Sequence, residues 1–459
     1  MKGMFTKFFA AAAVVSLGAL SLNADAQEML ASNIVKKGAL AKKDSATAAT
    51  TATELITGKK QAAQTAAEDT SWKPQRRLWG YAFGDFYYAA HAATGAFGKE
   101  TNYAGVPTYR NAIQFRRMYL GYDYDITKKF KAEVLLASEP NANTGVNGST
   151  SIQNGDNLVD GKMSFWIKNF NLRVRDLWTG TDFVIGEMST PGFALNEPGT
   201  NGPTTLAESE WGYRSIERTI TDIHKNNSYD VGVSLQGTFD PQTKNFGYVL
   251  FVGDNTTSSL LSASNPNTGF YKMFSGSLWG KFLNDHLHVD LYGHYAKTSL
   301  PTATVGDQSN HMFKIFADYR TKPLSVGVEA YTQTFENGLT NTTTKANVDP
   351  TVNGLSVWAK GGITKTLNYF ARFDTYNPYV DYVDTYTYSV NTNWSSYDPS
   401  YKEKFYTAGL DYNPTKNVHF MPNLWLMTFN DQRAATAAGY AKADHTLVYR
   451  FTFFFTFGK

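Results

Sequence analysis

Residues 445–457 have the sequence HTLVYRFTFFFTF, in which every second side chain from Tyr449 to Phe457 is aromatic. Arg450 and Thr452 lie between these aromatic positions. A period of two predicts a β-strand with one aromatic face and one mostly polar face. A strand that crosses lipid has its apolar face outside, and all its backbone groups must be paired in a closed sheet. The stretch therefore predicts a strand of a transmembrane β-barrel, with a buried strand of a soluble β-sandwich as the alternative.

The same alternation recurs along the body of the chain, residues 78–459. One strand is expected from Leu78, two more around Phe165 and Val184, and the others mostly form pairs joined by short turns. Together with the terminal strand they make 16. The paired strands are expected at 112–125 and 130–138, 229–239 and 246–253, 273–282 and 286–297, 311–320 and 324–335, 355–363 and 367–374, and 403–412 and 418–429.

Long connections alternate with the short turns and are rich in Asn, Gly, Ser, Thr and Pro. An even strand count with short turns at one end and long loops at the other is typical of bacterial outer-membrane barrels. We therefore predict an all-β fold, a 16-stranded antiparallel transmembrane barrel with periplasmic turns and extracellular loops. The long connections are expected at 91–111, 140–161, 189–228, 254–271, 298–310, 336–353, 375–402 and 430–444.

Composition excludes several other classes of protein. The chain has 459 residues, a net charge of +3, no Cys and 15% aromatic residues, and a mean hydropathy of −0.36. A bundle of transmembrane helices would need many long apolar runs. The absence of Cys excludes disulfides, Cys-ligated zinc and iron–sulfur clusters. The small net charge gives no sign of a nucleic-acid partner.

The N-terminal residues predict export. Lys2 and Lys7 precede an apolar stretch that ends near Leu22, and Ala24-Asp25-Ala26 resembles a signal-peptidase site. We therefore expect a cleaved signal peptide at 1–26, with a membrane anchor as the alternative. Residues 27–77 are rich in Ala, Thr and Lys and have few large apolar side chains, so we expect a flexible periplasmic segment. This segment serves either as a linker or as a tether.

The polar faces of the predicted strands would line a water-filled lumen, because a barrel of this size is not filled by its own wall. These faces carry nine cationic and eight anionic side chains. Selective pores use rings of one charge sign, so a balanced wall favours weak selectivity. The alternative is that these charges form cross-strand pairs that only stabilise the wall. The expected pore-lining residues are Arg117, Lys131, Glu133, Arg173, Asp230, Lys281, Asp290, Lys314, Asp318, Arg320, Glu329, Lys360, Arg372, Asp374 and Arg450.

The third long connection, 189–228, is the longest and is expected to fold inward as a constriction. Its charged residues have a mild acidic bias. The alternative is a lid or protomer contact outside the barrel. The expected constriction residues are Glu197, Glu208, Glu210, Arg214, Glu217 and Arg218.

Three stretches resemble the family of phosphate-selective porins O and P. FRRMYLGYDYD is similar to its Arg-Arg-x-x-Leu-Gly strand, and FVIGEMSTPGFAL to its Gly-Gln-x-x-x-Pro-Phe segment, with Glu187 in place of the amide. SIERTITDIHKNNSYDVGVSL resembles its Glu-Arg segment followed by Arg-Asp-x-Gly, with Tyr229 in place of the Arg. The resemblance implies a 16-stranded, commonly trimeric porin. The matching positions are Arg116, Arg117, Leu120, Gly121, Gly186, Pro191, Glu217, Arg218, Asp230 and Gly232.

No enzymatic chemistry is expected, because the sequence has no G-x-S-x-G, H-E-x-x-H or P-loop motif. We expect no catalytic residue, no cofactor and no metal site. His288, Asp290 and His294 share one strand face, but the two His residues would be ~20 Å apart, too far for one ion.

These patterns predict an outer-membrane porin that passes small hydrophilic solutes and ions passively in a Gram-negative cell. The expected partners are outer-membrane lipid, two further copies in a homotrimer, and the barrel-assembly machinery, which would recognise the aromatic C-terminal strand. Two alternatives remain open at this stage. One is an anion- or phosphate-selective porin, and the other is a non-conducting adhesin or accessory subunit of a larger complex.

Overall fold

A computed structural model describes residues 72–93, 107–138, 165–192, 210–224, 228–255, 271–302, 304–391, 398–433 and 444–458. The chain divides into two compact units, Met1–Lys73 and Pro74–Lys459. The predicted signal peptide and nearly all of the predicted periplasmic segment lie outside the described residues, so both remain predictions.

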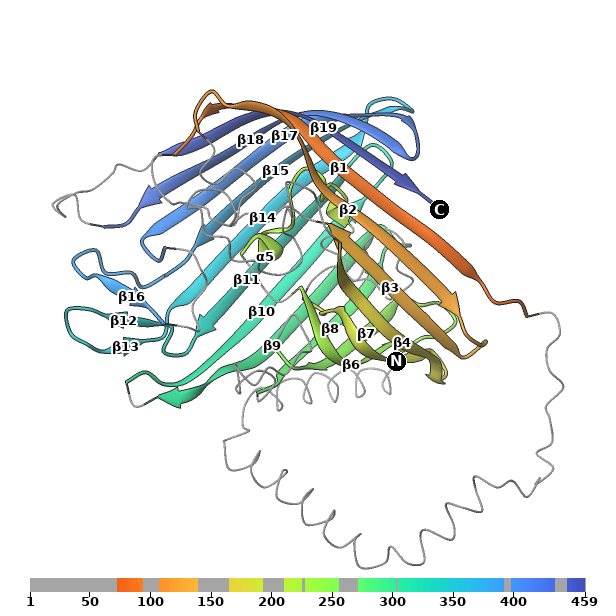
Figure 1. The fold of residues 1–459 in the computed structure, drawn as a ribbon, viewed down its shortest axis with the longest axis horizontal. Coiled ribbons are helices and arrows are strands. Elements are labelled where there is room, and N and C mark those ends of the chain that lie inside the picture. The colour runs from red at the N-terminus through yellow and green to blue at the C-terminus, as the bar shows by residue number, and fades with distance from the viewer. Residues whose placement is uncertain are drawn as a thin grey trace, which may run out of the picture. The chain divides into compact units, whose positions relative to one another are not determined.

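The second unit is a closed antiparallel barrel of 16 strands, with each strand bonded to its neighbour in the chain and the first bonded to the last (Figure 1). The fold class predicted from the sequence is therefore confirmed. The strands are β1 (Arg76–His91), β2 (Asn111–Asp125), β3 (Phe130–Ser138), β4 (Trp166–Trp178), β5 (Thr181–Ser189), β6 (Tyr229–Thr238), β7 (Phe246–Gly253), β8 (Met273–Phe282), β9 (Leu287–Thr302), β10 (Gly306–Arg320), β11 (Ser325–Phe335), β14 (Thr351–Gly362), β15 (Leu367–Asn377), β17 (Tyr401–Thr415), β18 (Val418–Asp431) and β19 (His445–Phe457).

Three of the predicted long connections differ from the structure. The expected loop 298–310 is largely strand, because β9 runs to Thr302 and β10 begins at Gly306. Two other connections contain short strands, β12 (Leu339–Asn341), β13 (Asn347–Val348) and β16 (Tyr388–Val390), which pair in a separate three-stranded sheet. The polar composition of these connections concealed their pairing, because Asn and Thr clusters between strands are typical of turns and loops.

The two faces of the barrel wall differ in chemistry, as the terminal strand predicted. On β19, Tyr449 and Phe451 are 53% and 45% exposed, whereas Arg450 and Thr452 are 4% and 0% exposed. The same contrast appears on β10, where Phe313 and Ile315 are exposed and Lys314 is buried. Large apolar side chains therefore cover the outside of the barrel, while polar and charged groups lie inside.

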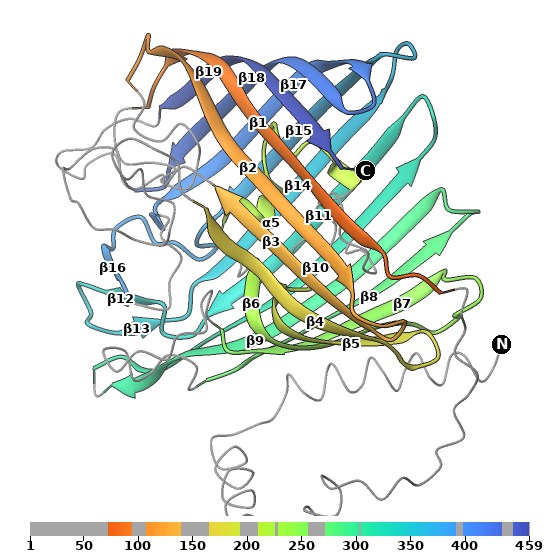
Figure 2. The ribbon, with the colours of Figure 1, turned by 45° about the vertical axis from the view of Figure 1, so that its right-hand side comes forward.

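The barrel closes between its first and last strands, which lie side by side in Figures 1 and 2. Gly80 and Gly84 lie opposite Phe457 and Phe453. A Cβ atom at either glycine would collide with the facing ring, so only glycine admits these two rings. On the inner face, the buried carboxylate of Asp85 accepts a hydrogen bond of 2.6 Å from Thr452 Oγ1. Asp85 also pairs with Arg116 Nε of β2 at 2.6 Å, which ties three strands together at the seam.

The helix α5 (Ile220–Ile223) has four residues, and the described residues Glu210 and Trp211 are also helical. No helix in the described part of the chain is long and apolar enough to span a bilayer.

Replacing Phe451 by Arg tests whether the outer face contacts lipid. The side chain is 45% exposed in the middle of β19. An Arg on a lipid-facing strand near the bilayer midplane costs about 2–4 kcal/mol. We expect Phe451→Arg to lower the midpoint of urea unfolding in lipid vesicles, followed by heat-modifiable gel mobility, while Phe451→Leu keeps it close to wild type. Equal midpoints for the two variants would mean that this face does not meet hydrocarbon.

Candidate functional site

The segment 210–224, from the third long connection, lies inside the ring of strands in both views (Figures 1 and 2). Its apolar side chains Trp211, Ile216 and Ile220 are completely buried. Trp211 and Ile216 belong to a cluster with inward-facing residues of the wall, and Ile220 belongs to a second such cluster. The wall residues of the first cluster are Trp279, Phe316, Trp358, Phe370 and Met421, and those of the second include Tyr292, Met312, Tyr331, Val352 and Tyr376.

Cationic side chains of the wall hold this segment by its backbone. Arg116 Nη2 donates to Ser215 O, and Arg450 Nη1 donates to Ile216 O at 3.1 Å. Arg372 Nη1 donates to the carbonyl oxygens of Glu217 at 3.5 Å and Arg218 at 2.5 Å. Lys360 Nζ donates to Trp211 O at 3.2 Å. A buried segment with little regular structure needs partners for its carbonyl groups, and here charged donors from four strands supply several of them.

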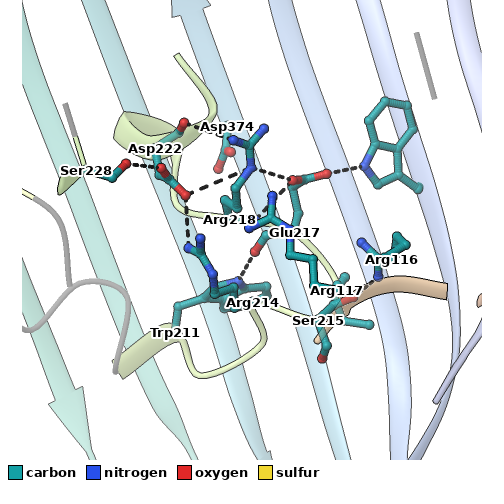
Figure 3. Close-up of polar contacts among 12 residues, drawn as sticks. Arg116, Arg117, Trp211, Arg214, Ser215, Glu217, Arg218, Asp222, Ser228 and Asp374 are labelled. Atoms are coloured by element: carbon teal, nitrogen blue, oxygen red, sulfur yellow. Dashed lines mark hydrogen bonds and ion pairs between the residues drawn. The ribbon is translucent and has the colours of Figure 1, made fainter. Parts of the chain in front are cut away.

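An ion-pair network inside the segment fixes its own shape (Figure 3). Asp222 pairs with Arg214 Nη1 at 2.9 Å and with Arg218 Nε at 3.9 Å. Its other oxygen accepts a hydrogen bond of 2.6 Å from Ser228 Oγ. Burial raises the pKa of Asp222, but Arg214, Arg218 and the Ser228 hydroxyl together hold it at about 2. Asp222 is therefore an anion at neutral pH.

Further contacts join the segment to the wall along its length. Tyr213 OH donates to Asp411 at 3.2 Å, and Thr221 Oγ1 donates to Glu329 at 2.7 Å. Trp425 Nε1 donates to Glu217 Oε2 at 2.9 Å. Near the long-loop end of the barrel, the ring of His224 stacks on Tyr376 with 3.4 Å between centroids. The segment thus extends from the short-turn end toward the long-loop end, against the wall formed by β8–β11, β14, β15 and β17–β19.

The wall formed by β3–β6 carries a second network of alternating charge. Glu133 accepts a hydrogen bond of 2.8 Å from Lys131 Nζ and pairs with Arg173 Nε at 3.4 Å. Arg173 Nη1 also contacts Asp182 at 3.1 Å and Gln236 Oε1 at 2.9 Å. Each charge therefore has an opposite charge beside it, on the same strand or on the next one.

All the residues expected from the sequence to line the interior lie on inward-facing strand positions. The ion pairs of Arg372 with Asp374 and of Lys314 with Glu329, at 2.5 Å and 3.5 Å, support the alternative that many of these charges stabilise the wall. Among the expected constriction residues, Glu197 and Glu208 lie outside the described residues. Glu210, Arg214, Glu217 and Arg218 lie in the segment inside the barrel.

Sequence reasoning missed Arg116 as an inward-facing residue. A β-bulge in β2 pairs Phe83 with Arg117 and Gly84 with Phe115, so both arginines point inward. The signal was present, because two consecutive arginines between outward-facing Phe115 and Met118 break the period of two. No local signal in the sequence indicated that Trp211 packs against the wall or that Trp425 donates to Glu217, because both contacts depend on the path of the long connection.

No protein-family model and no curated protein matches the chain. Among solved structures, the fold is similar to the anion-selective porin from Comamonas acidovorans, with a TM-score of 0.51 and 13% identity over 84% of this chain and 100% of that one. It is also similar to the outer membrane channel DcaP of Acinetobacter baumannii, with a TM-score of 0.52 and 10% identity over 84% of this chain and 97% of that one. At these identities the likeness shows the fold alone.

Replacing Arg450 by Met tests whether the wall holds the segment. The change keeps most of the side-chain volume and removes the donor to Ile216 O and the 2.7 Å hydrogen bond to Asn423 Oδ1. A hydrogen bond from a charged donor contributes about 1.5–3 kcal/mol, so we expect amide exchange in 210–224 to accelerate by about tenfold or more. Arg433→Met at the rim, where Arg433 pairs with Asp431, is the control. Unchanged exchange in Arg450→Met would show that the segment is held by other contacts.

Proposed function

We propose that this protein is an outer-membrane porin through which small hydrophilic solutes and ions diffuse passively. The observation that carries the proposal is the reversal of an ordinary core: apolar side chains cover the outside of a closed barrel and charged groups lie within it. A barrel of 16 strands is wide enough for an aqueous channel in addition to an internal segment. No catalytic step forms part of the proposal.

The segment 210–224 is proposed as the constriction. It is anchored on the wall from β8 to β19 and on β2, which leaves the wall of β3–β7 to border the proposed path. That wall offers Lys131, Glu133 and Arg173 in alternating charge. Solutes would therefore pass between the polar wall of β3–β7 and the side of the segment that faces it.

We expect weak charge selectivity because the interior cations already donate hydrogen bonds to the protein. Arg116, Arg372, Arg450 and Lys360 donate to backbone carbonyls of the segment. Arg173 is surrounded by acceptors on neighbouring strands. A cation whose donors are already engaged attracts a passing anion less than its formal charge suggests.

An anion- or phosphate-selective porin is the second candidate. It is favoured by the inward-facing pair Arg116 and Arg117, which also carries the resemblance to phosphate-selective porins O and P. One structure with a similar fold is itself described as an anion-selective porin. A homotrimer, contact with outer-membrane lipid and recognition of β19 by the assembly machinery also belong to the proposal.

Conductance in planar bilayers tests the proposal directly. Purified protein, shown to be folded by heat-modifiable mobility, would be recorded in asymmetric KCl. We expect stable ohmic steps and a reversal potential that is a small fraction of the ideal Nernst value. A large reversal potential of anionic sign, with block by inorganic phosphate, would instead establish the second candidate. Absence of conductance from folded protein would refute both and favour a non-conducting adhesin or accessory subunit.

Acid should release the constriction through Asp222. The pKa of this group is lowered by its ion pairs from 3.8 to about 2, so the stabilisation is complete above about pH 4 and is lost as the pH falls toward 2. We expect open-channel current noise to increase over that window. Asp222→Asn should show the noisy state already at neutral pH, whereas Asp254→Asn in a different connection should behave as wild type. A quiet Asp222→Asn channel would contradict this role for Asp222.

A further inference from the structure

Three ligand-type side chains from separate parts of the chain converge near the short-turn end of the interior. Glu210 comes from the internal segment, His288 from β9 and Asp318 from β10, and one donor atom of each lies within 4.8 Å of the others. His288 Nδ1 is 3.3 Å from Glu210 Oε1 and 3.9 Å from Asp318 Oδ1. All three residues are buried.

Asp318 is the unusual member of this cluster. The residue is 1% exposed, and neither of its carboxylate oxygens has a hydrogen-bond partner. The basic side-chain nitrogens near it are His288 Nδ1 at 3.9 Å and Arg320 Nε at 4.0 Å. Burying a carboxylate without a hydrogen bond costs free energy, and binding a cation or a proton would offset this cost. His288 Nδ1, on the facing side, also has no hydrogen-bond partner.

We propose that Glu210, His288 and Asp318 bind a divalent first-row transition-metal ion, for which Zn²⁺ is the probe. Zinc binds imidazole nitrogen and carboxylate oxygen at about 2.0–2.2 Å, so two ligands of one tetrahedral ion lie about 3.3 Å apart. The two distances from His288 Nδ1 are close to this separation and need only small side-chain movements. One nitrogen and two oxygens leave a position for water. This proposal does not depend on the channel function.

The surroundings of His288 support the nitrogen as a ligand. Its other ring atom, Nε2, lies 2.8 Å from Asp285 Oδ1. When Nε2 donates its hydrogen to this carboxylate, Nδ1 keeps its lone pair free for a metal, which is the usual arrangement of metal-binding histidines. Lys360 is near the cluster, but its Nζ donates to the backbone carbonyls of Glu210 and Trp211.

Arg320 is the competitor of the metal. Its guanidinium contacts Glu210 Oε1 at 2.8 Å, Asp285 Oδ2 at 3.0 Å and His288 Nε2 at 2.6 Å. The side chain is 31% exposed, so it can turn outward toward Asp285 when an ion takes its place. Metal binding would then replace a labile ion pair by a coordinate bond between the internal segment and two wall strands.

The test measures Zn²⁺ binding to full-length folded protein in detergent, without a polyhistidine tag, by equilibrium dialysis and elemental analysis. A second cluster, His91, Asp444 and His445, could bind metal at the seam. All measurements are therefore made in the His91→Gln/His445→Gln background. We expect one Zn²⁺ per chain.

Variants of the three ligands and of Arg320 decide whether the bound ion is at this site. His288→Gln and Asp318→Asn should each lower the affinity by at least ~10-fold. Arg320→Gln should raise it by about tenfold, because a competing positive charge is removed. His311→Gln, on the outward face of β10, is the matched control and should leave binding unchanged.

Two results would overturn the proposal. The first is no stoichiometric Zn²⁺ in the background protein or in Arg320→Gln, which would leave a proton as the partner of Asp318. The second is binding that persists in both His288→Gln and Asp318→Asn, which would place the metal elsewhere. Because Arg320→Gln predicts a gain, a folding defect in one ligand variant does not leave the question open.

Discussion

The pairing between β1 and β19 is the constraint on which the whole structure depends. A sheet whose outer surface is apolar and whose inner surface is charged has no stable open form in lipid, because its two edges would leave backbone groups unpaired. Closure removes both edges at once. It also defines an inside and an outside, so alternate side chains along each strand face either the lipid or the interior of the barrel. The buried contacts of Asp85 with Arg116 and Thr452 reinforce the closure from the inner side.

The interior shows why the number of formal charges is a poor predictor of the charge selectivity of a channel. Its cations face inward as their strand positions require, yet several of them are donors to the backbone of a segment that has little regular structure of its own. Arg372 is the clearest case, since it pairs with Asp374 and also donates to two carbonyl oxygens of the segment. The wall and the internal segment therefore stabilise each other, and these cations serve the fold as well as the charge of the interior.

The fold could be predicted from the sequence because its main signals are local. Alternation along 445–457 and the short turns between paired strands fix the number of strands and the face of each side chain. The contacts of the interior could not be predicted in this way. Periodicity states that His288 and Asp318 point inward, but their meeting with Glu210 depends on strand register and on the path of a long connection. The bulge at Arg116 could be predicted in part. The two consecutive arginines indicate an irregularity in the strand, but they do not indicate which residues Arg116 contacts.

The glycines of the first strand make its apolar cover depend on closure of the barrel. Gly80 and Gly84 leave bare backbone on the membrane side of β1, and the rings of Phe457 and Phe453 cover it. The apolar cover of β1 at these positions is thus supplied by β19, the strand that closes the barrel. Without β19, β1 would lose both its hydrogen-bonding partner and these rings, so an unpaired edge and bare backbone would both meet lipid. The membrane-facing side of β1 is therefore covered only when β19 is in place and the barrel is closed.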